Sequence, residues 1–488
     1  MSIIKIEDLT FAYPGSAENV FEGLNLTLDS SWRLGLVGRN GRGKTTLLRL
    51  LMGGYGYSGR IISSVGYSYF PCPVADGTRP LTEVLRGVCP QAEDWELERE
   101  LGLLGVDESA LERPFETLSN GERTKALLAA LFLDGGSFPL IDEPTNHLDA
   151  AGRRRVAKYL SGKRGFILVS HDRSFLDGCV DHILSLNRSG VEVRSGSFSA
   201  WMADFEARQE AELALNGRLR KDIDRLKRSA ARTSEWSDRV EASKKGAADK
   251  GYVGHRAAKM MKRSKAIEAR QTQAAERKAA LLKDVESAEE LKLSPLVYRA
   301  ETLASFAEVS VAYGGRRVCA PVSFEVRRGD RVALSGGNGS GKSSLIKLLL
   351  GEDIPHGGTV RAGSGLAISY VPQDASRLSG SLADYAREKG IDESLFKAIL
   401  RKLDFERSQL GRDMRELSAG QKKKVLLAGS LCERAHLYVW DEPLNFIDLY
   451  SRIQLERLIC AVKPTMVFVE HDSAFRASVA TKVVELSR

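Results

Sequence analysis

Two short stretches of the sequence combine glycines, a lysine and a hydroxyl side chain in a spacing that suits phosphate binding. Both read G-x-x-x-x-G-K-[ST], with Lys44 before Thr45 in the first and Lys342 before Ser343 in the second. Each follows an apolar strand and opens a helical run, so loop N–H groups can surround phosphates while the lysine and the hydroxyl reach the terminal phosphate and Mg²⁺. The loop residues that we expect to bind ATP are Gly38, Asn40, Gly41, Gly43, Lys44, Thr45 and Thr46, and then Gly336, Asn338, Gly339, Gly341, Lys342, Ser343 and Ser344.

A pair of adjacent acids ends an apolar strand in each half of the chain. Asp142 and Glu143 end one such strand, and Asp441 and Glu442 end the other. The aspartate can complete the Mg²⁺ shell, together with Thr45 or Ser343, while the glutamate polarises the attacking water. A purely structural acid pair at the end of a buried strand is disfavoured, because burying unpartnered charge is costly.

A histidine follows a later strand in each half, as His171 and His471. A lone histidine after a strand is more often structural, but two at matched positions favour contact with the γ-phosphate. We therefore expect His171 and His471 to join Glu143 and Glu442 as catalytic residues.

These chemical positions repeat along the chain. Tyr13 recurs as Tyr313, Lys44 as Lys342, Ser119 as Ser418, Glu143 as Glu442 and His171 as His471, at offsets of 298 to 300 residues. A shared period of this kind indicates a duplicated domain. Short apolar strands alternate with helical stretches in both copies, which is typical of a parallel α/β sheet. We expect domains at residues 1–200 and 303–488, with an insert at 201–302.

The insert has the pattern of two long helices. No proline occurs from about residue 199 to 244. A single apolar seam runs along this stretch at spacings of 4, 3, 4 and 3 residues, through Leu219, Ile223, Leu226, Ala230 and Thr233. Three glycines then break the helix, and a second helical run extends from His255 to about Leu291. The sequence predicts an antiparallel helical hairpin with its tip at about 244–254.

Positive charge is concentrated in this insert. Residues 218–265 contain 16 Lys/Arg and 6 Asp/Glu, a net charge of +10, whereas the whole chain of 488 residues carries +8. A charge run is usually a solvated helix surface, but this concentration favours a polyanionic partner. The residues that we expect to contact that partner are Lys244, Lys245, Tyr252, His255, Lys259, Lys262 and Arg263.

Several classes of protein are disfavoured by composition. The sequence has no uninterrupted apolar run near 18 residues and no signal-peptide pattern at its start, so we expect a cytoplasmic protein without membrane contact. Its six cysteines form no C-x-x-C, which indicates reduced thiols rather than metal or disulfide sites.

A third motif carries a resemblance to a known family. Residues 118–122 (LSNGE) and 417–421 (LSAGQ) resemble the LSGGQ signature of the ATP-binding cassette (ABC) superfamily. The resemblance implies an α/β fold with two ABC-type nucleotide-binding domains, here called the first and second cassettes, joined by the helical hairpin. It implies two composite ATP sites within one monomeric chain: Ser418 and Gly420 complete the first cassette's site, and Ser119 and Gly121 the second's.

The same resemblance assigns further roles and one asymmetry. Tyr13 and Tyr313 are similar to the aromatic residues that stack on adenine. Gln373, in the sequence YVPQ, is similar to the glutamine that senses Mg²⁺ and water, whereas the first cassette has Cys72 at that position. A thiol is a poor ligand for Mg²⁺ or water compared with an amide oxygen.

The whole chain resembles the ABC-F family, whose members are cytosolic ATPases that act on the ribosome. Glu442-Pro443-Leu444-Asn445, the long linker and its second helix are similar to the antibiotic-resistance branch, especially Lsa-like proteins. This implies ATP-dependent binding to the 50S E site, contacts with 23S rRNA and P-site tRNA, and displacement of lincosamides, streptogramin A and pleuromutilins. The alternatives are a housekeeping ABC-F translation factor, an ATPase subunit of an ABC transporter, and a DNA-repair ATPase, in which a coiled coil would interrupt one cassette.

We predict that the two sites are both active but turn over at different rates. Glu143→Gln and Glu442→Gln, made separately, should leave different residual ATPase activities, because only the second cassette has the glutamine. Steady-state phosphate release measures both. Equal residual turnover would contradict the asymmetry.

Overall fold

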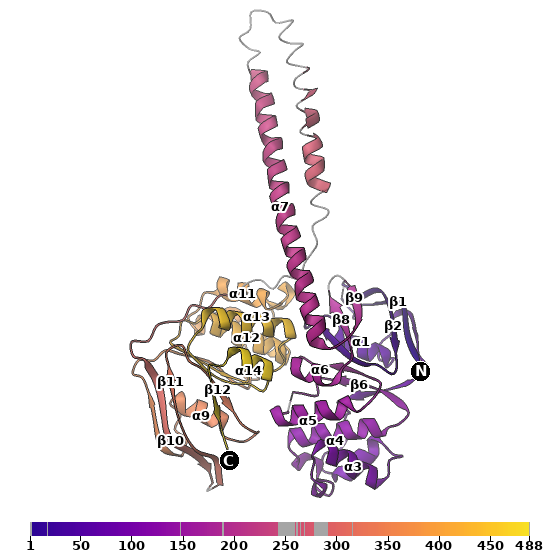
Figure 1. Ribbon diagram of the computed structural model, residues 1–488, viewed down its shortest axis with the longest axis vertical. Helices are drawn as coiled ribbons and strands as arrows, with labels where there is room; N and C mark the ends of the chain where they lie inside the picture. Colours follow the sequence, from indigo (N-terminus) through magenta and orange to yellow (C-terminus); the bar gives the residue numbers. More distant parts are fainter. Residues whose placement is uncertain are drawn as a thin grey trace, which may run out of the picture. The chain divides into compact units, whose positions relative to one another are not determined.

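The computed structural model describes residues 2–16, 18–146, 148–187, 190–242, 259, 262–263, 265–267, 269–277, 291–314 and 316–487 (Figure 1). The chain divides into two compact units. One comprises Met1–Trp201 and Ala288–Arg488 and contains both cassettes, and the other comprises Met202–Ser287.

The first cassette is built on two sheets. A three-stranded antiparallel sheet has the order β2-β1-β4, and a six-stranded, mainly parallel sheet has the order β5-β6-β7-β3-β8-β9. The strands are β1 (Ile3–Phe11), β2 (Phe21–Asp29), β3 (Arg33–Gly38), β4 (Ser58–Ile62), β5 (Gly66–Phe70), β6 (Ser137–Asp142), β7 (Phe166–Val169), β8 (His182–Asn187) and β9 (Gly190–Ser195). The helices are α1 (Lys44–Leu51), α2 (Leu81–Val88), α3 (Asp94–Leu104), α4 (Asn120–Leu133), α5 (Ala150–Ser161) and α6 (Arg173–Cys179), with 3₁₀ turns at Glu108–Ala110 and Phe115–Thr117.

The second cassette repeats this plan. Its sheets have the orders β11-β10-β13 and β14-β15-β16-β12-β17. The strands are β10 (Thr302–Tyr313), β11 (Arg316–Arg327), β12 (Arg331–Ser335), β13 (His356–Ala362), β14 (Ile368–Val371), β15 (Leu437–Asp441), β16 (Met466–Val469) and β17 (Lys482–Glu485). The helices are α9 (Lys342–Leu349), α10 (Leu382–Glu388), α11 (Glu393–Lys402), α12 (Ala419–Cys432), α13 (Leu449–Val462) and α14 (Ser473–Val479), with 3₁₀ turns at Arg407–Gln409 and Met414–Glu416. The predicted α/β fold class is confirmed.

The central strands explain why the motifs meet. All four residues of β7 and of β16 are buried, as expected for parallel strands covered on both faces. β3 pairs in parallel with β7, and β7 with β6. The phosphate loop after β3, the acids ending β6 and the histidine after β7 therefore lie at the same edge of the sheet, where α/β proteins bind ligands.

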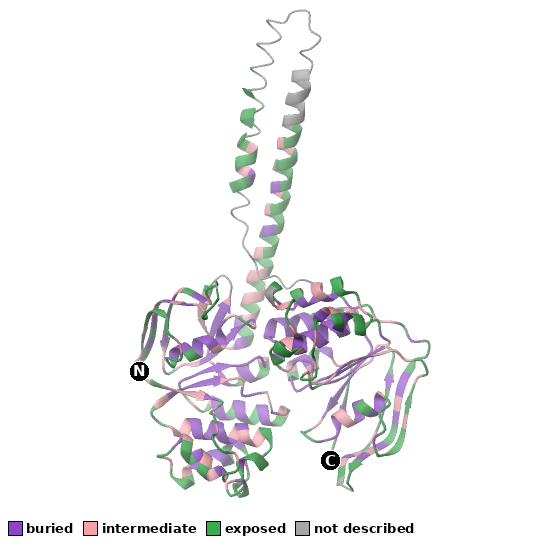
Figure 2. Cartoon of the chain, turned by 180° about the vertical axis from the view of Figure 1, so that it is seen from behind, coloured by how far each residue is buried: buried purple, intermediate pink, exposed green. Residues whose placement is uncertain are grey.

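The second unit contains most of α7 (Phe198–Ala242) and a helical segment described in part between 259 and 277. Ile223 is buried on α7 and Ala275 on the other segment, and the Gln271 Nε2 donates to the Ser229 Oγ at 2.9 Å. Leu219, Leu226 and Ala230 of the predicted seam are half-buried. The two segments thus pack side by side, and Figure 2 shows their remaining surface mostly exposed.

The sequence predicts that the insert extends to residue 302. Leu291 and Leu293, within that range, are buried in the same hydrophobic cluster of the second cassette as Tyr438 and Trp440. The tip residues Lys244, Lys245, Tyr252 and His255 lie outside the described residues, and the predicted seam residue Thr233 lies where side chains are not described. Among the helices that the structure describes, none has the length and apolarity to cross a bilayer.

Replacing Ile223 by alanine should weaken the contact between the two segments of the insert. The lost burial removes about 2 kcal/mol from the local stability, so amide hydrogen exchange across 216–232 should become about 30-fold faster. Hydrogen-exchange mass spectrometry measures this change. Arg225→Ala, on the exposed side of the same helix, is the control and should leave exchange unchanged. Equal effects of both substitutions would refute the packing seam.

Candidate nucleotide sites

Both phosphate loops require glycine immediately before the helix. Gly43 and Gly341 have φ of 85° and 84°, in the left-handed region. A Cβ on Gly43 would lie 2.7 Å from a methyl group of Val20, and one on Gly341 would lie 2.8 Å from the Cβ of Cys319. Only glycine satisfies both the backbone and the space.

The loop lysines occupy matching positions inside their loops. The Lys44 Nζ donates to the carbonyl oxygen of Gly38 at 2.7 Å, and the Lys342 Nζ donates to that of Gly336 at 2.8 Å. Burial lowers the pKa of both lysines below the ordinary value. A phosphate bound in the loop would favour the charged form again, so both ammonium groups are placed for an anionic ligand.

Four of the five residues predicted to hold Mg²⁺ form two pairs of oxygen donors, and the fifth, Gln373, donates to Glu442. The Thr45 Oγ1 donates to the Asp142 Oδ2 at 2.7 Å, and Ser343 is hydrogen-bonded to Asp441. The buried Oδ1 of Asp441 has no hydrogen-bond partner in the described part of the chain, and burial raises the pKa of this carboxyl group. These hard oxygen donors fit Mg²⁺, which when bound would neutralise charge on the terminal phosphates.

The structure brings each predicted catalytic glutamate to its histidine. The Nε2 of His171 lies 3.3 Å from the Oε1 of Glu143, and that of His471 lies 3.4 Å from the Oε1 of Glu442. Both glutamates have a positive φ, 52° and 47°, which is uncommon for a residue with a side chain. The same unusual backbone at matched positions aims both carboxylates at their sites.

Glu442 is held by several hydrogen-bond donors. Its Oε2 accepts from the Nε2 of Gln373 at 3.0 Å and from the Nδ2 of Asn445 at 2.6 Å. Burial opposes ionisation, but hydrogen bonding and charge from His471, with the bonds from Asn445 and Gln373, lower the pKa of Glu442 to about 2. Glu442 is therefore an oriented, ionised carboxylate.

Glu143 has a different environment. Burial, and then the neighbouring charge of Asp142, raise the pKa of Glu143 to about 7. Cys72 stands where the second cassette has Gln373, and its thiol donates to the backbone oxygen of Tyr69 at 3.2 Å. The asymmetry that the sequence indicates is therefore also a difference in how each glutamate is held.

The first composite site is one continuous cavity of about 840 Å³. From the first cassette it is lined by Tyr13, Asn40, Gly41, Gly43, Lys44, Thr45, Thr46, Asp142, Glu143 and His171, and from the second cassette by Ser418, Gly420 and Gln421. The two cassettes also touch here, because the Asn40 Nδ2 donates to the carbonyl oxygen of Phe446 at 3.1 Å. The predicted residues of this site are thus brought together across the cassettes.

The second composite site is divided. Ser119 and Gly121 face Asn338 across a cavity of about 390 Å³. Ser343, Gln373 and Asp441 line a separate cavity of about 840 Å³ within the second cassette. Tyr313 lines neither of these two cavities; it is half exposed, and its hydroxyl lies 3.1 Å from the Ser344 Oγ.

The signature serines begin helices that point at the opposite phosphate loop. The Ser119 Oγ accepts from the N–H of Glu122 at 3.2 Å, and the Ser418 Oγ accepts from that of Gln421 at 3.3 Å. The side chain of the fifth residue of each motif, Glu122 or Gln421, accepts from the serine N–H, which completes a capping box. The remaining free N–H groups and the helix dipole favour an anion there.

We did not predict a buried ion pair that also belongs to the first site. The Lys424 Nζ lies 2.8 Å from the Asp448 Oδ2, both side chains are nearly inaccessible, and Lys424 lines the cavity. The signal was present in the repeat, because Asp149 and Lys125 stand 299 residues earlier. A lysine within a helix looks like a surface residue until its burial is known.

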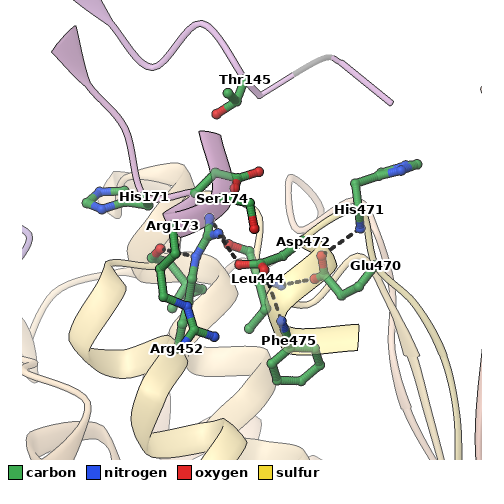
Figure 3. Close-up of polar contacts among 12 residues, drawn as sticks. Thr145, His171, Arg173, Ser174, Leu444, Arg452, Glu470, His471, Asp472 and Phe475 are labelled. Atoms are coloured by element: carbon green, nitrogen blue, oxygen red, sulfur yellow. Dashed lines mark hydrogen bonds and ion pairs between the residues drawn. The ribbon is translucent and has the colours of Figure 1, made fainter. Parts of the chain in front are cut away.

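A second buried acid fixes the loop after the second acid pair (Figure 3). The Glu470 Oε1 accepts from the N–H of Leu444 at 2.7 Å, and its Oε2 accepts from the N–H of His471 at 3.1 Å. In the first cassette the matching residues are Thr145 and Ser170, whose hydroxyl oxygens lie 3.4 Å apart. The loop after the acid pair is therefore held by a carboxylate and backbone N–H groups in the second cassette, and by two hydroxyl side chains in the first.

Replacing the pair of the second cassette by that of the first should show whether Glu470 acts by positioning the loop after the acid pair or only by stabilising the fold. Glu470→Ser alone leaves the Leu444 N–H unpartnered and should lower turnover at the second site about 10-fold, since an unsatisfied buried donor costs about 1–3 kcal/mol. Adding Leu444→Thr recreates the first cassette's pair and should restore much of the rate. Turnover is measured in a Glu143→Gln background, which isolates the second site. A double variant no faster than the single one would contradict this role.

Comparison with known proteins identifies the family. The ABC transporter profile matches residues 21–146 and 319–445, together more than half of the chain. The ATP-binding protein Uup of Caulobacter vibrioides is 29% identical over 99% of this chain and 77% of its own length. The ribosome protection protein VmlR of Bacillus subtilis is 27% identical over 95% and 83%.

A solved structure has a related fold. It is the complex of archaeal ribosomal stalk protein aP1 with the archaeal ribosome recycling factor aABCE1, which matches with a TM-score of 0.65 at 20% identity, covering 99% of this chain and 87% of that one. This likeness concerns the fold alone. On the profile match to both halves, the chain belongs to the ABC transporter family of ATP-binding proteins and is an ATPase with two such domains.

Proposed function

We propose that this ATPase is an ABC-F protein that binds the ribosome and protects it from antibiotics of the peptidyl-transferase centre. The observation that carries the proposal is the match to VmlR, named a ribosome protection protein, which extends over both cassettes and the insert between them. Under this proposal the 50S E site receives the insert, which contacts 23S rRNA and the P-site tRNA. Lincosamides, streptogramin A and pleuromutilins would be displaced.

The exposed charge on the insert supports an RNA partner. Side chains that the structure describes as exposed there include Arg218, Arg220, Lys221, Arg225, Lys227, Arg228, Arg232, Lys259, Lys262, Arg263 and Lys265. Such cations replace the counterions of a nucleic-acid backbone, so binding should weaken steeply as salt rises. Asp224 is the single acid among the exposed described residues from 218 to 232.

ATP would act as a clamp between the cassettes. In the first site, Lys44 and Thr45 hold the phosphates and Mg²⁺ from one side, while Ser418 and the start of α12 hold them from the other. The negative charge of the phosphates thereby favours the closed arrangement. Hydrolysis, with Glu143 and Glu442 polarising the attacking waters, removes that bridging charge and releases the ribosome.

The catalytic double variant Glu143→Gln/Glu442→Gln should bind ribosomes in the presence of ATP and fail to release them. We expect co-sedimentation with 70S particles in ATP, loss of binding in ADP, and a steep decline with salt. Replacing Lys259, Lys262 and Arg263 together by alanine should weaken binding at least about 10-fold, since each phosphate contact contributes to affinity. Arg361, Arg412 and Arg434, exposed on the second cassette, supply the charge-matched triple control.

Expression in a drug-sensitive bacterium separates protection from a general translation role. The wild-type chain should raise the inhibitory concentrations of lincosamides and pleuromutilins, whereas the double glutamine variant should not. If the protein binds ribosomes but does not raise the inhibitory concentrations, the result favours a housekeeping translation factor over a resistance protein. Failure to co-sediment in ATP would refute the ribosome proposal itself.

A further inference from the structure

The cassette interface is closed differently on its two sides. On one side Arg173 of α6 forms an ion pair with Glu456 of α13, so the first and second cassettes are tied directly. The positions related by the internal repeat are Ser473 of α14 and Ala157 of α5, at offsets of 300 and 299 residues. The register is secure, because Arg153 pairs with Asp172 just as Arg452 pairs with Asp472. One side therefore lacks its ion pair.

A cavity of about 390 Å³ lies where that ion pair would be. Its polar lining includes Arg154, Lys158, Ser161 and Ser174 from the first cassette and His471 and Ser473 from the second. The Ser473 Oγ donates to the Ser174 Oγ at 2.9 Å, so the two cassettes meet at its wall through hydroxyl groups. Its volume is near the lower end of the range for small-molecule sites, about 300–1,000 Å³.

The charge of this cavity is positive. Arg153 is neutralised by Asp172 at 2.9 Å, but within the described part of the chain no carboxylate lies within ion-pair distance of Arg154 or Lys158. These two cations stand four residues apart on α5 and so share one helix face. At the repeat-related position of Arg154 the second cassette has Ile453, so the charge pair belongs to this side only.

We propose that this cavity binds a dianionic phosphate group, either inorganic phosphate or the phosphate of a small monoester. Arg154 and Lys158 supply the charge, and the Ser174 hydroxyl supplies a neutral donor while it accepts from the Ser473 hydroxyl of the second cassette. The bound anion takes the place of the ion pair that Arg173 and Glu456 make on the other side. It thereby stabilises the pairing of the cassettes.

The site is separate from the nucleotide sites but is connected to one of them. It shares no lining residue with the two composite cavities. His471, however, lines this cavity and also lies 3.4 Å from Glu442. Occupancy therefore bears on the second nucleotide site, and the coupling is reciprocal: ATP-driven closure raises the affinity for the anion as the anion favours closure.

The test uses the full chain as the Glu143→Gln/Glu442→Gln variant, saturated with ATP and Mg²⁺ so that phosphate cannot enter the nucleotide sites. Inorganic phosphate and glycerol phosphate are titrated separately at constant ionic strength, and the melting temperature is recorded. We expect a saturable rise of about 2 °C for at least one of them. Which probe acts at the lower concentration distinguishes free phosphate from a monoester.

Two matched double variants assign the effect to the cavity. Arg154→Ala/Lys158→Ala should abolish the saturable rise, whereas Arg155→Ala/Arg164→Ala removes equal charge from neighbouring residues outside the lining and should retain it. Phosphate also stabilises proteins non-specifically, and the second variant measures that contribution. Ala157→Glu/Ser473→Arg, which installs the missing ion pair, should raise the melting temperature without phosphate and remove the response. A rise that is absent, or equal in all variants, overturns the proposal.

Discussion

The nucleotide sites depend on contact between the phosphate loop of one cassette and the segment that follows the acid pair of the other. The Asn40 amide reaches the backbone of Phe446, and Asp149 accepts a hydrogen bond from the backbone of Asn338. Both asparagines occupy the same place in their loops, so the contact is made once in each direction. Contacts from the opposite cassette therefore reach both phosphate loops, and in the first site they line one continuous cavity with the loop.

Within this shared frame the two halves have diverged in how tightly they hold their reactive groups. Two amides donate to one oxygen of Glu442 and His471 lies beside the other. Glu143, in contrast, lies 3.3 Å from His171, but its buried Oε1 has no hydrogen-bond partner in the described part of the chain. The interface itself is also uneven, with an ion pair at Glu456 and a cavity at Ala157. A duplicated domain thus keeps its binding motifs while its supporting contacts become specialised.

The sequence predicted much of the fold, and it predicted which residues of the two loops gather at one edge of each sheet, because those residues follow short motifs and one period. The α/β class and the seam through Ile223 of α7 follow from local pattern. The sequence placed Glu143 and His171 in one site, and their direct contact became known only from the structure. The sequence also showed that the first copy has Cys72 where the second copy has a glutamine.

The sequence did not predict the features that depend on burial or on contacts between residues distant in the chain. Lys424 and Glu470 look like ordinary surface residues until the structure shows that both are buried. The lining residues of the second composite site fall in two separate cavities, which no motif records. Leu291 and Leu293 likewise belong to a cassette core only because that core offers them an apolar surface.

The left-handed backbone at Glu143 and Glu442 affects how substitutions at these positions change the stability of the protein. A side chain in that conformation stores about 1 kcal/mol or more of strain, which glycine would relieve. Substituting glycine there would make folding easier while deleting the reactive carboxylate. At these two positions glycine would therefore favour stability, whereas glutamate is needed for turnover. Both copies have glutamate despite its strained backbone.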